Sequence, residues 1–202
     1  MKIELLSITP NAEKIIERCT RICYNSEDKT TDISHEKFLP GIIKRGHVSP
    51  LSFAHAVFHI QEISRACSHQ LVRHAHLRYL QRSQRYCAEN DPHYVIPEGI
   101  HEREFAKDMD HAWEGYRQMQ EIGIKNEDAR YILPNACETE MCVAGNFQAW
   151  FGFLKLRLGK HAQQEIRELA QLIYKELNHQ CPNIFNQTNL LVQPKLNLDF
   201  GE

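Results

Sequence analysis

Long hydrophobic runs are missing from this sequence, since no apolar stretch approaches the ~20 residues that a membrane-spanning helix needs. The N-terminus, MKIELLSITP, also lacks the apolar stretch and the small-residue cleavage site of a signal peptide. The sequence has no large excess of either charge, since its net charge is −2 at pH 7. A general binder of nucleic acids or membrane surfaces, in contrast, carries a broad basic excess. These absences predict a cytoplasmic protein with neither a membrane nor a nucleic acid as its partner.

Several catalytic motifs are absent as well. The sequence contains no GxSxG, no P-loop and no GxGxxG, so hydrolase, NTPase and Rossmann-fold interpretations have no support. Twelve histidines are present, but no carboxylate lies at a metalloenzyme spacing such as HExxH. The seven cysteines are odd in number and scattered, which favours reduced thiols, and the pair Cys19 and Cys23 has no second pair at ligand spacing. We therefore predict that the protein holds no metal.

The hydrophobic pattern predicts long helices and few strands within a single domain, residues 1–202. Strands are expected at residues 2–8 and 51–62. Helices are expected at residues 11–23, 34–44, 63–74, 101–122, 126–131 and 162–178, with one more capped by Asn146. Residues 135–145 are ambiguous, and regular structure is expected to end in the segment CPNIFNQ, residues 181–187. The pattern predicts an α+β fold with a mixed or antiparallel sheet flanked by long helices.

Positive charge is concentrated in residues 73–86, RHAHLRYLQRSQRY. If residues 81–85 are extended, Gln81, Ser83 and Arg85 point to one side. They then offer an amide, a hydroxyl and a planar guanidinium, which suit a phosphate or a carboxylate. If the segment is instead helical, its arginines form a solvated basic stripe. The residue pattern leaves both interpretations open.

Two more arginines are candidates for a binding site. Asn146, Trp150, Phe153 and Arg157 share one face of the predicted helix, and a polar residue at each end of an apolar stripe indicates the rim of a pocket. Alternatively, Arg157 only extends from a buried face to the solvent. Arg130 has a similar alternative, as a cation that stabilises the C-terminal end of a helix.

The segment HQLVRHAHLRYLQRSQRY, residues 69–86, resembles the signature of the flavin-dependent thymidylate synthases. That signature is Arg-His-Arg, seven residues, Ser, then any residue followed by Arg-Tyr. Other segments resemble the same family in order and spacing: GHVSPL (46–51), EDARYILP (127–134), the helix from Asn146 to Arg157 and HAQQEIRELA (161–170). The resemblance covers residues from about 40 to 185.

The resemblance implies that family's fold and a homotetramer whose active sites are shared between subunits. It also implies FAD, reduced by NADPH, and transfer of a methylene group from methylenetetrahydrofolate to C5 of dUMP. The residues that it assigns to dUMP are Gln70, Gln81, Ser83, Arg85, Arg130 and Arg157. Ser83 and Arg157 are the catalytic candidates, because Arg157 would lie at the uracil and stabilise charge that builds on the ring. The residues that it assigns to FAD are His47, Ser49, Arg73, His74, Asn146 and His161.

The sequence departs from the family pattern mainly at positions assigned to the flavin. Ala75 replaces the third signature residue, Gln148 replaces an arginine, Ser52 and Phe53 replace Glu-His, and Leu80 replaces Asn or Ser. We therefore predict weaker FAD binding with an intact dUMP site. Two alternatives are a related enzyme that modifies C5 of another uridylate, and a nucleotide- or RNA-binding module that has lost catalysis. Arg157 argues against the second, because phosphate binding alone needs no cation at the base.

Overall fold

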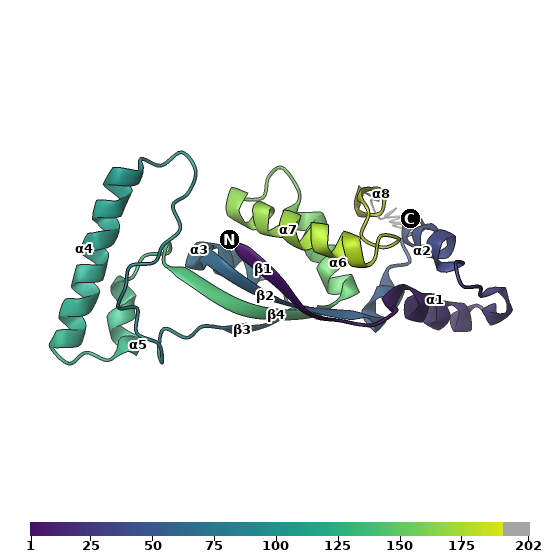
Figure 1. The fold of residues 1–202 in the computed structure, drawn as a ribbon, viewed down its shortest axis with the longest axis horizontal. Coiled ribbons are helices and arrows are strands. Elements are labelled where there is room, and N and C mark those ends of the chain that lie inside the picture. The colour runs from purple at the N-terminus through teal and green to yellow at the C-terminus, as the bar shows by residue number, and fades with distance from the viewer. Residues whose placement is uncertain (192–202) are drawn as a thin grey trace, which may run out of the picture. The chain divides into compact units, whose positions relative to one another are not determined.

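The computed structural model describes residues 1–191. Its strands are β1 (Lys2–Ile8), β2 (His55–Ser64), β3 (Arg78–Gln81) and β4 (Glu138–Asn146). Its α-helices are α1 (Ala12–Cys23), α2 (His35–Lys44), α3 (Arg65–Leu71), α4 (Glu102–Glu121), α5 (Asn126–Ala129), α6 (Phe147–Arg157), α7 (Gln164–Gln180) and α8 (Gln187–Leu191) (Figure 1). Short 3₁₀ helices are η1 (Glu27–Lys29), η2 (Ser49–Phe53) and η3 (Arg130–Ile132). None of the helices in residues 1–191 is long and apolar enough to span a membrane.

The four strands form one sheet in the order β1-β2-β4-β3. Strands β1 and β2 are antiparallel, because Thr9 N–H donates to the His55 carbonyl while the N-terminal ammonium group pairs with Glu62. Along β4 buried and partly buried residues alternate, as expected for a strand with one covered face. The predicted α+β fold, with a sheet and long helices, is confirmed.

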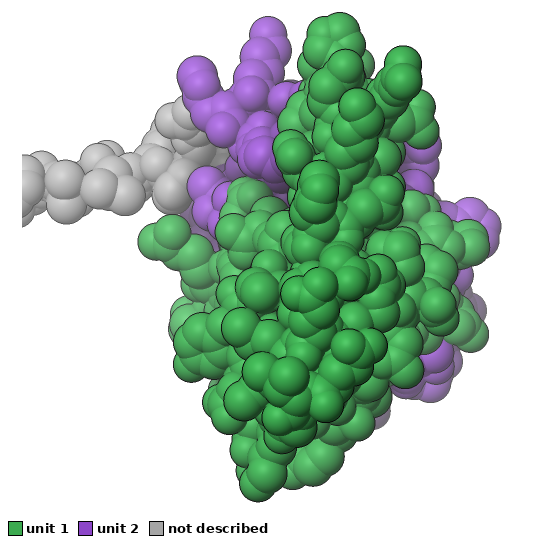
Figure 2. Space-filling model, turned by 90° about the vertical axis from the view of Figure 1, so that its left-hand side faces the viewer, with its two compact units in different colours: residues 1–4, 58–143 green, residues 5–57, 144–202 purple. Residues whose placement is uncertain are grey.

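The chain folds into two compact units, which Figure 2 distinguishes by colour. Unit 1 comprises Met1–Glu4 and Phe58–Val143. Unit 2 comprises Leu5–Val57 and Ala144–Glu202, of which the structure describes residues up to 191. That these units form a single domain stays a prediction.

Unit 1 is built around the fully buried indole of Trp113 on α4, which packs with Met109 and Cys137. The ring of Tyr94 lies 6.1 Å from that of Trp113, and a β-bridge joins Tyr94 to Cys137. The first turn of α3 is bonded to the same segment, since Arg65 N–H donates to the Cys137 carbonyl at 2.9 Å. These bonds bring the start of α3 beside residues 130–137.

Unit 2 has an aromatic core beneath α6. Trp150 and Phe147 are fully buried, and the indole N–H of Trp150 donates to the Ala56 carbonyl at 3.1 Å. The ring of Phe147 meets that of Phe185 edge to face at 5.0 Å. Helices α6 and α7 lie side by side (Figure 1). Asn146 caps α6 as predicted, because its side chain accepts the N–H of Ala149 at 2.8 Å.

Three local predictions are wrong, and the structure decides one point that the sequence left open. Residues 51–53, the start of the strand predicted at 51–62, belong instead to η2 (Ser49–Phe53), which begins at Pro50 and its neighbour because proline has a fixed φ and no N–H to donate to a ladder. Helix α3 ends at Leu71, so residues 73 and 74 follow it instead of ending it. Regular structure continues beyond residue 187 in α8. Of residues 81–85, which the sequence left open between strand and helix, only Gln81 lies in a strand, and residues 83–87 form neither.

Candidate functional site

Gln81 lies in the edge strand β3 and is held by its amide group. Its Nε2 donates to Ser68 Oγ at 3.0 Å and to Thr139 Oγ1 at 3.2 Å. Ser68 and Thr139 are both buried, on α3 and β4 respectively. The amide therefore ties β3 to its two neighbours and has a defined orientation.

Beyond Gln81 the chain closes into a turn. The ladder ends where Arg82 N–H donates to the Glu140 carbonyl at 3.0 Å. Ser83 then accepts hydrogen bonds from the backbone that follows. Its Oγ accepts the N–H of Arg85, and its carbonyl accepts those of Tyr86 and Cys87. A serine that bonds the backbone in this way favours a turn over a strand. Of the two interpretations that the sequence left open, neither the strand with Gln81, Ser83 and Arg85 on one side nor the helix describes this segment.

Arg85 and Arg130 converge on Glu127 at the start of α5. Nε of Arg85 lies 2.5 Å from Glu127 Oε2, and Nε of Arg130 donates to the Glu127 carbonyl at 3.1 Å. Arg130 is placed by the end of α5 and by η3, which stops before Pro134 as the sequence predicts. One residue thus holds two of the predicted phosphate ligands near each other.

A cavity of about 300 Å³ opens beside Arg130 in unit 1. Its lining consists of Arg65, His69, Gln84, Arg130, Tyr131, Leu133, Pro134 and Asn135. Two guanidiniums and an imidazole face one small space, which is a donor set suited to a phosphate. The sequence interpretation missed Arg65 and His69. Their spacing of four residues on α3 places them on one helix face and could have indicated them.

The guanidinium of Arg65 lies in an electrostatically unfavourable environment. Burial lowers the pKa of its guanidinium, and the charges of Arg130 and Arg82 lower it further, while Glu89 acts in the opposite direction. Its Nη2 donates to the Arg82 carbonyl at 3.0 Å, but its Nε is buried without a hydrogen-bond partner in residues 1–191. A phosphate oxygen would both satisfy this N–H and offset the repulsion.

The loop that carries Arg73 and His74 is fixed by Tyr79. The phenol O–H reaches the carbonyls of Leu71 and His74, each at 2.8 Å, and burial raises the pKa of Tyr79 to about 12. Arg73 is exposed on this loop, and His74 is partly buried.

At the third signature position, Ala75, the guanidinium of Arg78 contacts the backbone. Arg78 extends back along the chain, and its Nη1 donates to the Ala75 carbonyl at 2.9 Å and to the Leu77 carbonyl at 3.1 Å. A guanidinium therefore lies beside the position at which the signature has an arginine.

The remaining predicted residues belong to unit 2: His47, Ser49, Asn146, Arg157 and His161. His47 is the last residue of the Schellman motif that ends α2. In this motif Gly46 has a φ of +86°, and His47 N–H donates to the Ile42 carbonyl. Asn146 uses its Oδ1 to cap α6, which leaves its NH₂ group to donate.

The helix face from Asn146 to Arg157, predicted to border a pocket, does not do so in its middle, because Trp150 and Phe153 are fully buried in the core. Arg157 lies in the last turn of α6 and is partly buried. Gln148, one of the departures from the signature, lines a cavity of about 240 Å³ with Gly46 and Val48. The segment around His47 and helix α6 thus border the same space.

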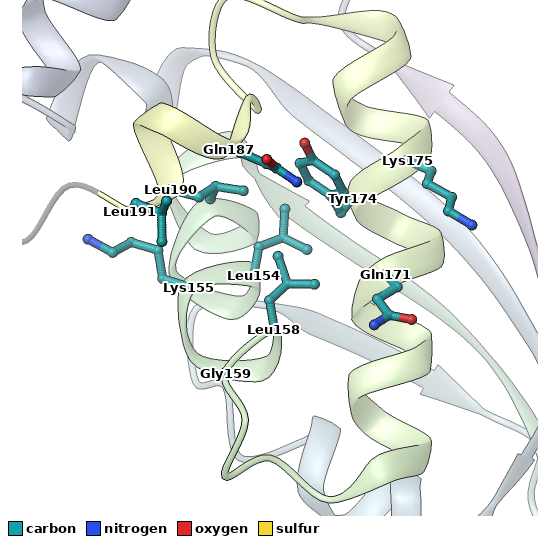
Figure 3. Close-up of a pocket in the computed structure, with 10 residues that line it drawn as sticks. All are labelled: Leu154, Lys155, Leu158, Gly159, Gln171, Tyr174, Lys175, Gln187, Leu190 and Leu191. Atoms are coloured by element: carbon teal, nitrogen blue, oxygen red, sulfur yellow. The ribbon is translucent and has the colours of Figure 1, made fainter.

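A larger cavity, of about 600 Å³, lies between α6, α7 and α8 (Figure 3). Leu154, Leu158 and Leu190 line it, while the ammonium groups of Lys155 and Lys175 point away from it. Its lining includes none of the residues predicted to bind dUMP or FAD. Its lining is mainly apolar, and it includes no arginine, whereas the smaller cavity of unit 1 is lined by Arg65 and Arg130. In residues 1–191 no three side chains of His, Cys, Asp or Glu form a metal site.

Comparison with known proteins points to one family. The Thy1 family model, described as thymidylate synthase complementing protein, matches residues 4–183. The chain is 33% identical to a flavin-dependent thymidylate synthase of Clostridium tetani, over 92% of this chain and 85% of the relative. It is 37% identical to the one of Geobacter sulfurreducens, over the same shares of the two chains.

Solved structures show the same fold. Thymidylate synthase X of Helicobacter pylori, crystallised with FAD and dUMP, is similar with a TM-score of 0.79 at 23% identity, over 95% of this chain and 100% of that one. The UMP/dUMP methylase PolB of Streptomyces cacaoi, bound with 5-Br dUMP, has a TM-score of 0.80 at 20% identity, over 91% and 92% of the two chains.

Proposed function

Because the chain belongs to the Thy1 family, we propose that it is a flavin-dependent thymidylate synthase, an enzyme that methylates dUMP reductively at C5. Methylenetetrahydrofolate donates the carbon and NADPH the reducing equivalents, through FAD. Full-length relatives at 33% and 37% identity carry this name, and their match covers most of both chains.

The cavity lined by Arg65, His69 and Arg130 is the observation that supports a nucleotide phosphate in unit 1. A phosphate monoester carries nearly two negative charges at neutral pH, and each charge-assisted hydrogen bond contributes ~1.5–3 kcal/mol. Arg85 joins the site by exchanging Glu127 for a phosphate oxygen. Gln70 and Gln81 lie on the neighbouring α3 and β3 and complete the dUMP residues.

Ser83 and Arg157 carry the catalytic roles in this proposal. The hydroxyl oxygen of Ser83 accepts the Arg85 N–H, so its own proton is left for the nucleotide to accept. Arg157 provides a permanent cation, which favours the form of the uracil with negative charge on the ring. Neither role needs a cysteine nucleophile.

FAD fits the chemistry of the residues predicted to hold it. Arg73 on the loop after α3 and Arg78 at the start of β3 are both exposed, and their guanidiniums suit the cofactor's two phosphates. The free NH₂ group of Asn146 and the imidazoles of His47, His74 and His161 provide donors, and Ser49 adds a hydroxyl. When bound and reduced, FAD would supply the hydride that completes the methyl group.

The proposal includes the oligomeric state: the protein forms a homotetramer whose active sites are shared between copies of the chain. Tyr131, which lines the phosphate cavity, is 86% exposed, and Leu80 and Tyr86 of the signature are 80% and 79% exposed. Large apolar side chains that are exposed in this way are typical of a surface that another chain covers. Light scattering at micromolar concentration tests this, and a monomer would contradict it.

The phosphate site is tested with Arg130→Ala and calorimetry. We expect dUMP affinity to fall about ten- to hundredfold, since one charge-assisted contact is lost. Arg103→Ala is the control, because Arg103 is an exposed arginine of α4 in the same unit and should leave binding unchanged. Equal dUMP affinity in parent and Arg130→Ala would refute the assignment of the cavity.

A further inference from the structure

Glu89 is a carboxylate enclosed in unit 1. The residue is 4% exposed, and its Oε1 is buried without a hydrogen-bond partner in residues 1–191. Its Oε2 lies 3.7 Å from Nη1 of Arg82. Its backbone N–H donates to the hydroxyl of Tyr116 at 3.2 Å, which anchors the residue to α4. Burying a carboxylate is costly unless both oxygens are satisfied, so packing alone does not account for an acid at this position.

Arg82 and Arg65 connect Glu89 to the phosphate cavity. Arg82 faces Glu89 with its guanidinium and accepts a hydrogen bond from Arg65 Nη2 with its carbonyl. Arg65 and Arg130 line the cavity itself. The positive charges of Arg82 and Arg130 destabilise the cationic form of Arg65, and the negative charge of Glu89 offsets part of this repulsion. Glu89 is therefore the buried counter-charge of this arginine cluster (Arg65, Arg82 and Arg130).

We propose that Glu89 is a positioning residue for the nucleotide phosphate, whose buried charge holds Arg82, and through the Arg82 carbonyl Arg65, in place before the ligand arrives. This inference rests on the proposed function, which assigns the cavity to a phosphate. Glu89 lies three residues beyond the signature segment, and no contact to the ligand is assigned to it.

Removing the charge of Glu89 has two opposite effects on phosphate binding. The net field becomes more positive, which attracts an anion. The arginine cluster also loses its counter-charge, so Arg65 and Arg82 repel each other and turn toward the solvent. The second effect is the larger one here, because the long side chains of Arg65 and Arg82 must then be ordered again during binding.

The test is Glu89→Gln, which keeps the size of the side chain and removes its charge. Calorimetry with dUMP is expected to show affinity reduced by about tenfold, near the lower end of the effect of one arginine–phosphate contact. Inorganic phosphate should lose affinity in parallel, while deoxyuridine, which has no phosphate, should bind parent and variant equally. Glu114→Gln is the matched control: it removes an equal charge from an exposed carboxylate of unit 1, paired with Arg117 at 3.1 Å, and should not change dUMP affinity.

A double-mutant cycle separates positioning from a general loss of structure. In the Arg65→Ala background, Glu89→Gln should weaken dUMP binding far less than in the parent, because the group that it positions is gone. Additive losses would mean that Glu89 supports the fold rather than Arg65, and unchanged or tighter binding in the single variant would overturn the proposal as well. If Glu89→Gln does not fold, the cycle is run with Glu89→Asp, whose shorter side chain withdraws the charge from Arg82, and parental affinity in that variant overturns the proposal.

The outcomes also separate this inference from the proposed function. A parent protein that binds neither dUMP nor inorganic phosphate contradicts the proposed function. A parent that binds dUMP through Arg130 but is unaffected by Glu89→Gln contradicts only the role of Glu89.

Discussion

Replacing Glu127 by glutamine is expected to tighten dUMP binding, because this carboxylate competes with the phosphate for Arg85. Oε2 of Glu127 lies 2.5 Å from Nε of Arg85, so the ion pair must open before the guanidinium can contact a ligand. Arg130 should keep its orientation in the variant, since it donates to the backbone carbonyl of Glu127 and not to the carboxylate. The substitution therefore removes the competitor of one arginine without releasing the other.

The magnitude follows from exposure. The side chains of Arg85 and Glu127 are 59% and 34% exposed, and ion pairs of this kind contribute about 0.2–1 kcal/mol after solvent screening. Removing the competition should thus lower the Kd for dUMP by a factor of about 1.4 to 5 at low salt. The gain should shrink as salt is added, because exposed charges are screened.

Calorimetric titration with dUMP at two salt concentrations measures this effect, with Glu114→Gln as the control for removing an exposed, arginine-paired carboxylate. Weaker dUMP binding by Glu127→Gln would refute the reasoning. In that case the ion pair orients Arg85 toward the ligand instead of withholding it.

Three further predictions concern the base, the flavin and a buried thiol. Arg157→Lys should lower kcat more than it raises KM for dUMP, because a cation at the uracil acts mainly in the transition state, and an effect on KM alone would mean uniform binding. Ala75→Arg should raise FAD affinity in a flavin-fluorescence titration, and unchanged affinity would mean that Arg78, which already contacts the Ala75 carbonyl, replaces the missing group. Burial raises the pKa of the Cys137 thiol to about 11, so this thiol should stabilise the fold below the unfolded value near 9 and lose that contribution as the pH rises toward 11, as urea unfolding across this range will show. In the native protein at pH 8 a thiol reagent should label the exposed Cys87 but not Cys137.

Much of the fold follows from local pattern in the sequence. Helices α1 and α7 are predicted because apolar residues recur at helical spacing, and that periodicity needs no knowledge of the partner surface, while α4 is predicted as a long polar helix. The cap at Asn146 and the end of α2 near Gly46 also depend on only a few neighbouring residues. The family signature is local in the same sense, so the residue types of the site could be identified from the sequence.

The course of the chain through that signature was decided by tertiary contacts. Residues 83–87 become a turn because the ladder to β4, more than fifty residues later in the chain, ends at Arg82. The hydroxyl of Ser83 then accepts the N–H of Arg85, and its carbonyl accepts those of Tyr86 and Cys87. A short polar segment is compatible with strand, helix and turn, and the position of its hydrogen-bonding partner selects among them.

The composition of the phosphate cavity likewise needed the three-dimensional structure. Arg65 faces Arg130 because the first turn of α3 is bonded to residues 135–137, a pairing that no periodicity within α3 reveals. The sequence determined which donors the protein has. Only the tertiary structure decided that Arg82 pairs with the buried Glu89 and Arg85 with the exposed Glu127, because the strength of a charge pair depends on the distance and the burial that folding imposes.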